Sequence, residues 1–188
     1  MNKLLLSAAL VASVGVAALA PRTASAVDGT ITITGKVVAQ TCTVDGSAFG
    51  TPDTSVTAAM PLVLAPVLAT SGAVAGKTQF QMVVANCDPS LSSVQAFFSG
   101  PNIQTDGNLK NPTLAGNATN VEVQLLNSSS TVMNLNNATA TAQNSPVVTL
   151  TGSPTKGATL TYFAQYYSTG GSTAGNVNTT VQFTMNYL

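Results

Sequence analysis

The sequence predicts an all-β domain, a sandwich of short strands. Segments rich in Val, Ile, Thr, Phe and Tyr recur along the chain, and clusters of Gly, Pro, Asn, Asp and Ser separate them. In the last such segment, residues 177–187, polar and apolar side chains alternate from Thr180 to Tyr187. A strand with one buried face has this alternation. Very little of the chain has a helical pattern.

The chain begins with the features of a secretory signal peptide. Met1-Asn2-Lys3 gives a positive start, residues 4–20 are an apolar run, and residues 21–26 end in Ala-Ser-Ala. This order of features predicts cleavage after Ala26. The apolar run is short for a membrane anchor of about 20 residues. We therefore expect residues 1–26 to be removed on export.

Removal of residues 1–26 leaves 162 of the 188 residues, enough for one domain with a hydrophobic core. The exported chain has four Lys against five Asp and one Glu, a net charge of −2. With so few charged residues, the chain has no basic surface that would attract nucleic acid or an anionic membrane.

The first residues of the exported chain also have a strand pattern. One face is mostly Thr, and the other carries Val27, Gly29, Ile31, Ile33, Gly35 and Val37. A strand that is apolar on one side needs a partner for that side. The pattern alone also fits an ordinary first strand of the same sandwich.

The other strands follow from segments rich in strand-forming residues and from the turn residues between them. Pro61 and Pro66 interrupt the second predicted segment, which we therefore expect to be an edge or bent strand. The predicted strands are residues 30–44, 56–64, 78–85, 94–99, 120–126, 147–150, 159–167 and 177–187.

The exported chain has two cysteines, Cys42 and Cys87. Because an exported chain meets an oxidising compartment, we expect them to form a disulfide. Closing this loop stabilises the fold by about 4 kcal/mol in the chain-entropy model. A metal-binding or reactive thiol is disfavoured because the chain has no His and no Cys-x-x-Cys motif.

The sequence does not predict an enzyme. Without His, the commonest general base and metal ligand is missing. The six acidic residues are scattered, mostly in turn-like segments, and neither a Gly-x-Ser-x-Gly motif nor a phosphate-binding loop occurs. We expect no catalytic site, no cofactor and no metal.

Taken together, these segments resemble the type 1-like subunits of chaperone–usher fimbriae, a family that includes the major pilins. The similarity spans nearly all of the exported chain, in residues 29–38, 41–44, 80–88, 118–126 and 162–167. A glycine fourteen residues from the end and a penultimate tyrosine are characteristic of that family. Gly175 and Tyr187 occupy these positions here.

The resemblance implies an incomplete immunoglobulin-like sandwich over residues 39–188, preceded by a donor-strand extension at residues 27–38. A strand from the neighbouring subunit completes the sandwich. The implied donor residues are Val27, Gly29, Ile31, Ile33 and Val37. Those implied to line the groove or to contact the chaperone are Gly175, Val181, Phe183, Met185, Tyr187 and Leu188.

The same resemblance implies a structural pilus subunit that polymerises by donor-strand exchange and supports adhesion and biofilm formation. Its implied partners are identical or homologous subunits, a periplasmic chaperone and an outer-membrane usher. It implies export through the periplasm to a Gram-negative cell surface. Because the extension is short, a minor or tip adaptor subunit stays open. A small outer-membrane β-barrel and a secreted immunoglobulin-like binding module are alternatives from other classes.

Overall fold

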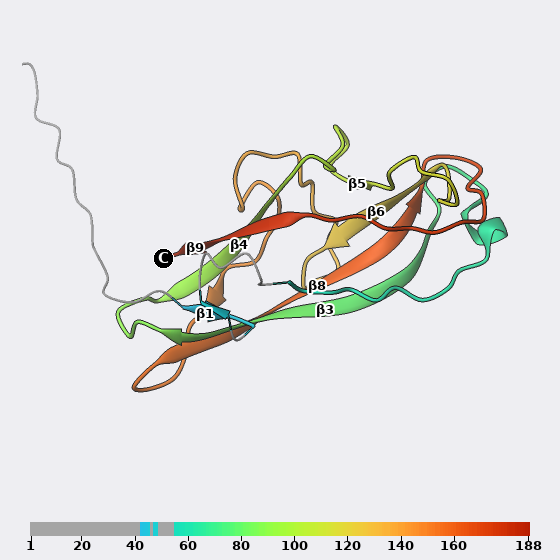
Figure 1. Ribbon diagram of the computed structural model, residues 1–188. Helices are drawn as coiled ribbons and strands as arrows, with labels where there is room; N and C mark the ends of the chain where they lie inside the picture. The colour runs from blue at the N-terminus through green and yellow to red at the C-terminus, as the bar shows by residue number, and fades with distance from the viewer. Residues whose placement is uncertain (1–41, 46, 49–54) are drawn as a thin grey trace, which may run out of the picture. The chain divides into compact units, whose positions relative to one another are not determined.

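The computed structural model describes residues 42–45, 47–48 and 55–188 (Figure 1). The predicted signal peptide 1–26 and donor extension 27–38 lie outside these residues. The described chain forms two antiparallel sheets, which confirms the predicted all-β class. One has six strands in the order β2-β1-β3-β8-β6-β5, and the other has three in the order β7-β4-β9.

The six-stranded sheet is built on a long central pair, β3 (Val74–Cys87) and β8 (Lys156–Ser168). Their register shifts between Ala75 and Thr78, where Gly76 has a φ of +67°. Such a shift marks a β-bulge, for which a glycine with positive φ is suited. The remaining strands of this sheet are β1 (Thr43–Val44), β2 (Ser47–Ala48), β5 (Leu109–Lys110) and β6 (Val121–Leu126).

The three-stranded sheet consists of β4 (Ser93–Ser99), β7 (Val148–Thr149) and β9 (Gln182–Tyr187). In Figure 1 the last strand, β9, runs along β4, with which it pairs from Val94↔Tyr187 to Ser99↔Gln182. Since β9 has no strand on its other side among the described residues, it is an edge strand.

The inward faces of both sheets share one hydrophobic core. Tyr162 of β8 is fully buried at its centre, 5.7 Å from the Phe80 ring and 5.2 Å from the Phe98 ring. Its hydroxyl forms a 2.9 Å hydrogen bond with the hydroxyl of Ser145. Burial raises the pKa of the Tyr162 phenol. An aromatic trio therefore joins β3, β4 and β8.

The predicted disulfide between Cys42 and Cys87 is confirmed. Both cysteines are fully buried, and β1 directly after Cys42 pairs with β3 just before Cys87. The bond therefore fixes the start of the described chain to the end of the longest strand.

Two predicted strands differ from the observed ones. Residues 56–64 are not assigned to any strand and lead into a 3-10 helix, η1 (Ala65–Leu68), which the sequence did not predict. The last strand begins at Gln182 and not at residue 177. In both segments the amino-acid pattern suits a strand, but no neighbouring strand pairs with them among the described residues. The short strands β2 and β5 were also not predicted.

Candidate functional site

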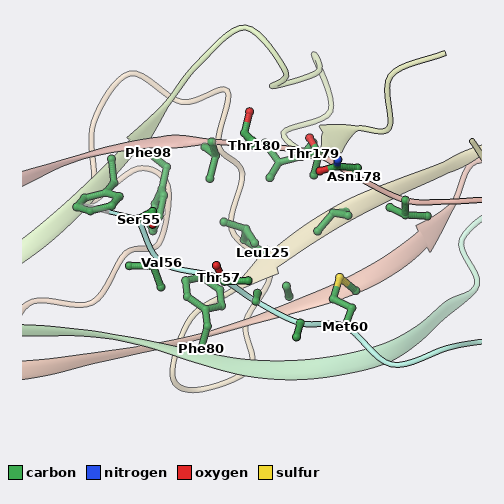
Figure 2. Close-up of a pocket in the computed structure, with 18 of the residues that line it drawn as sticks. Ser55, Val56, Thr57, Met60, Phe80, Phe98, Leu125, Asn178, Thr179 and Thr180 are labelled. Carbon is green, nitrogen blue, oxygen red and sulfur yellow. The ribbon is translucent and has the colours of Figure 1, made fainter. Parts of the chain in front are cut away.

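A groove of about 650 Å³ opens between two segments that belong to neither sheet. One wall is formed by residues 55–60 and the other by residues 177–181, which lead into β9. Figure 2 shows Val56 and Met60 on one side, Thr179 and Thr180 on the other, and Leu125 of β6 between them. The groove therefore lies where a further strand would fit between the walls.

The labelled residues also show that the two walls run in opposite directions (Figure 2). Ser55 lies toward the Phe98 end of the groove and Met60 toward the Asn178 end, whereas Asn178 precedes Thr180 along the other wall. A strand inserted between them would be parallel to one wall and antiparallel to the other.

The floor of the groove is the inward face of the six-stranded sheet, and it is apolar apart from the Tyr166 hydroxyl at one end. Met82 and Leu125 are 1% and 3% exposed, so the floor is continuous with the buried core. None of the residues that line the groove is charged. The floor residues are Phe80, Met82, Leu109, Val123, Leu125 and Ala164.

Along both walls, half-buried side chains alternate with exposed ones. Val56, Ala58 and Met60 are half-buried, and the residues between them are exposed. The opposite wall has the same alternation, with Val177, Thr179 and Val181 half-buried. The Thr179 hydroxyl is buried and has no hydrogen-bond partner among the described residues. Each wall thus has one face directed inward, as a strand of a sandwich does.

The backbone edge of the second wall is open toward the groove. Leu188 and Ser93 exchange two backbone hydrogen bonds of 2.9 and 3.0 Å across β9 and β4. Because alternate residues direct their backbone groups to opposite edges, even-numbered residues of this segment face β4 and odd-numbered residues face the groove. Within the described chain, no hydrogen bond reaches the backbone of Val177, Thr179 or Val181.

The first wall is open in the same way. No backbone hydrogen bond is made by residues 55–60 to any other part of the chain that the structure describes. At the end of this wall the Tyr166 hydroxyl donates to the carbonyl oxygen of Pro61 at 3.2 Å. Burial raises the pKa of the Tyr166 phenol. The wall is therefore positioned by side-chain packing and leaves backbone donors and acceptors for another strand.

Of the residues that the resemblance implied for groove or chaperone contact, some line the groove and others lie elsewhere. Val181 and Phe183 line the groove. Met185 is buried in the core, and Leu188 is 60% exposed at the chain end. Gly175 does not line the groove but lies against the backbone of Asn117 and Ala118, where an added Cβ would come within 2.4 Å of the Ala118 nitrogen.

Tyr187 is half-buried and packs against the core cluster. Burial raises the pKa of its phenol. The implied donor residues Val27, Gly29, Ile31, Ile33 and Val37 lie outside the described residues.

Sequence reasoning missed the first wall and the floor as parts of the site. The sequence predicts residues 56–64 as an edge or bent strand, but nothing in this segment indicates that it borders a groove. The floor residues gave the ordinary signal of core strands.

Other kinds of site find little support. No group of three or more His, Cys, Asp or Glu side chains within residues 42–45 and 55–188 is arranged to hold a metal ion. In the described part of the chain, no helix has the length and apolar character that crossing a membrane requires.

Comparisons with known proteins agree on one family. The family model of type-1 fimbrial protein, A, matches residues 60–188. The chain is 39% identical to the major fimbrial subunit SMF-1 of Stenotrophomonas maltophilia strain K279a over 173 residues, which cover 90% of this chain and 98% of that protein. It is 40% identical to the F17 fimbrial protein of Escherichia coli over 181 residues, which cover 92% and 95% of the two chains.

The fold is similar to that of a solved subunit from a chaperone–usher pilus, with a TM-score of 0.54 and 17% sequence identity. That match covers 90% of this chain and 100% of the solved one. The family match, the fimbrial relatives and this fold lead to one conclusion: the chain belongs to the type-1 fimbrial proteins, the pilin subunits of chaperone–usher pili.

Proposed function

We propose that this fimbrial subunit polymerises by donor-strand exchange, in which the extension of one copy fills the groove of the next. The observation that carries the proposal is a groove with two open backbone edges over an apolar floor. Two open backbone edges beside an apolar groove favour the addition of a strand, because the strand can make main-chain hydrogen bonds and bury its own apolar side chains in the groove.

The dimensions of the proposed donor suit the groove. At about 3.3 Å per residue, residues 27–37 extend about 36 Å, whereas the wall from residue 177 to Phe183 extends about 23 Å. The extension can therefore pair along the whole groove and still reach the body of its own subunit.

The apolar face of the proposed donor also matches the apolar floor of the groove. The donor face with Ile31, Ile33 and Val37 would lie on the apolar floor, and each fully buried aliphatic side chain contributes roughly 1.5–3 kcal/mol. Gly29 would lie where the groove is too narrow for a side chain. A shift of one residue would turn Thr30, Thr32 and Thr34 inward, so assembly depends on register.

Before assembly, the same groove needs another strand, and we propose that a periplasmic chaperone supplies it. Val181 and Phe183, which line the groove, would contact that strand, with Tyr187 and the carboxylate of Leu188 as further contacts. Met185 and Gly175 would support this surface from within the fold, since Met185 is buried in the core and Gly175 lies against Ala118. An outer-membrane usher would then exchange the chaperone strand for the extension of the next subunit. This order of events requires export through the periplasm before the subunit joins a surface fimbria.

We further propose that the chain is a shaft subunit and that the fimbria supports adhesion and biofilm formation. The relative that is named a major fimbrial subunit covers 90% of this chain at 39% identity, which supports the shaft position. Gold-labelled antibodies along the length of isolated fimbriae would support this position. Labelling confined to the ends would identify a minor or tip adaptor subunit.

The experiment that tests donor-strand exchange uses the exported chain with Ile31→Asp and Ile33→Asp in its own extension, refolded at low concentration, and a peptide that copies residues 27–38. We expect the peptide to raise the melting temperature and prevent self-association. A peptide with Ile31→Asp and Ile33→Asp is the matched control. The proposal is contradicted if both peptides stabilise the chain equally or if neither peptide stabilises it.

A further inference from the structure

Two asparagine side chains hold the second wall of the groove where β4 no longer reaches it. β4 ends at Ser99, which pairs with Gln182, so the same register would place Pro101 opposite Thr180. Proline has no backbone N–H and cannot continue the ladder. The side chain of Asn102 supplies the missing donor, because its Nδ2 donates to the Thr180 carbonyl oxygen at 3.0 Å and to the Thr180 hydroxyl at 3.2 Å.

Asn111 acts in the same way one step further along the wall. Its Oδ1 accepts a 3.0 Å hydrogen bond from the backbone N–H of Asn178. Its Nδ2 donates to the carbonyl oxygens of Asn176 and Ala118, each at 2.9 Å. The side-chain amide of Asn111 therefore forms hydrogen bonds with one backbone donor and one backbone acceptor of the segment 176–178.

Both asparagines bond the edge of the wall that faces away from the groove. Asn178 and Thr180 are even-numbered, as is Leu188, which bonds to β4. Their backbone groups point to the same edge, and those of Val177, Thr179 and Val181 point toward the groove. Asn102 and Asn111 thus take the place of a neighbouring strand on the outer edge and leave the inner edge open.

The two asparagines are themselves fixed by a short hairpin. Ile103 and Leu109 form a bridge, and Lys110 N donates to the Asn102 carbonyl oxygen at 2.9 Å. Leu109 pairs with Val123 of β6, so the hairpin is anchored to the six-stranded sheet. The wall, in contrast, continues into β9 of the three-stranded sheet. The asparagine bonds therefore link the two sheets beside the groove.

We propose that Asn102 and Asn111 are positioning residues for strand uptake, which hold residues 177–181 in strand register before the incoming strand arrives. This inference rests on the proposed function, in which a second copy of the chain provides that strand. A wall that is already ordered loses less conformational entropy on pairing than a free segment does. Loss of either asparagine therefore weakens uptake, although neither touches the incoming strand.

Amide hydrogen exchange measured by NMR tests the positioning directly. The sample is the full exported chain with Ile31→Asp and Ile33→Asp, so that its own extension does not fill the groove. We expect the Asn178 amide to exchange slowly and the Thr179 and Val181 amides to exchange fast. Addition of the unmodified 27–38 peptide slows Thr179 and Val181 and leaves Asn178 slow.

Variants in the same background separate positioning from general stability. Asn111→Ala should make Asn178 exchange fast, because no Oδ1 remains to accept its hydrogen bond. Asn111→Asp should not restore full protection, because its second carboxylate oxygen would face the Ala118 and Asn176 carbonyl oxygens to which Nδ2 now donates. Each of Asn102→Ala and Asn111→Ala should weaken peptide binding about tenfold, the effect of losing roughly one net hydrogen bond. Asn136→Ala is the control, because Asn136 Nδ2 bonds to the Thr105 carbonyl oxygen, which is not part of the wall.

The outcomes are distinct. Equally fast exchange at Asn178 and Thr179 before peptide addition overturns the inference, and this result needs no asparagine variant. So does peptide binding of normal strength in folded Asn102→Ala and Asn111→Ala chains. If the peptide does not bind the parent chain at all, the proposed function fails. In that case the role in strand uptake fails with it, and the Asn178 exchange pattern still shows whether the asparagines order the wall.

Discussion

A charge placed on the donor strand provides the sharpest test of strand uptake. Ile33→Asp would put a carboxylate on a groove floor where Met82 and Leu125 are 1% and 3% exposed. Since no residue that lines the groove is charged, this carboxylate would find no cationic partner there. The variant therefore loses an apolar contact and gains an uncompensated charge.

The expected magnitude follows from these two effects. Losing the aliphatic contact costs about 1.5–3 kcal/mol, and an unpaired buried charge costs about 3–5 kcal/mol. Their sum, at least about 4.5 kcal/mol, corresponds to binding more than about a thousandfold weaker. This loss of binding affinity should become smaller as the pH falls. Burial raises the pKa of a carboxyl group, and its neutral form is less costly to bury than the carboxylate.

The assay compares peptides that copy residues 27–38 in titrations against one refolded exported chain, whose own extension carries Ile31→Asp and Ile33→Asp so that the groove stays open. A Thr32→Asp peptide is the matched control. Thr32 lies on the opposite face of the donor, so its substitution adds the same charge where the strand meets solvent. We expect the control peptide to bind about as tightly as the unmodified one. If the Thr32→Asp peptide binds as poorly as the Ile33→Asp peptide, the assignment of the donor faces is wrong. If both bind normally, the groove does not receive this strand.

Three further predictions concern the stability of the subunit. Desolvation raises the pKa of Glu122 above its ordinary value of 4.5, with the Asp106 carboxylate nearby. A raised folded-state pKa adds stability below the ordinary value, and this is lost as the pH rises through the folded pKa. The urea midpoint should therefore fall more from about pH 4 to about pH 7 in the native chain than in Glu122→Gln; equal falls would refute this. Gly175→Ala should lower stability by about 1–3 kcal/mol because its Cβ meets the Ala118 backbone, and an unchanged melting temperature would contradict that packing. Cys42→Ser with Cys87→Ser should cost about 4 kcal/mol in denaturant unfolding, and a loss below about 1 kcal/mol would rule out a stabilising role for the disulfide.

The strands that could be predicted from the sequence are those whose pairing is continuous along a neighbouring strand. Residues 94–99 and 120–126 are rich in aliphatic and aromatic side chains, and they correspond closely to β4 and β6. Residues 56–64 and 177–181 were also predicted as strands but have no strand beside them among the described residues. Side-chain alternation reports which face is buried, and it contains no information about hydrogen-bond partners. β5 has only two residues, too few for any periodic signal.

The site could be predicted only in part for the same reason. Val181 and Phe183 were identified through the resemblance, and both line the groove. The floor residues of β3, β6 and β8 have the signal of any core strand, so the sequence does not distinguish a covered core from an open one. Asn102 and Asn111 lie near Pro and Gly, where asparagine ordinarily indicates a turn. Their role depends on the end of β4, which only the three-dimensional register reveals.

The most direct test of the central claim is a cryo-electron microscopy map of fimbriae assembled from this chain. The account predicts an extended segment between residues 55–60 and 177–181 of each subunit, with side-chain density that fits Ile31 and Ile33 of a neighbouring copy. Continuous density from that segment to the same subunit's own Cys42, or a groove without a strand, would contradict it.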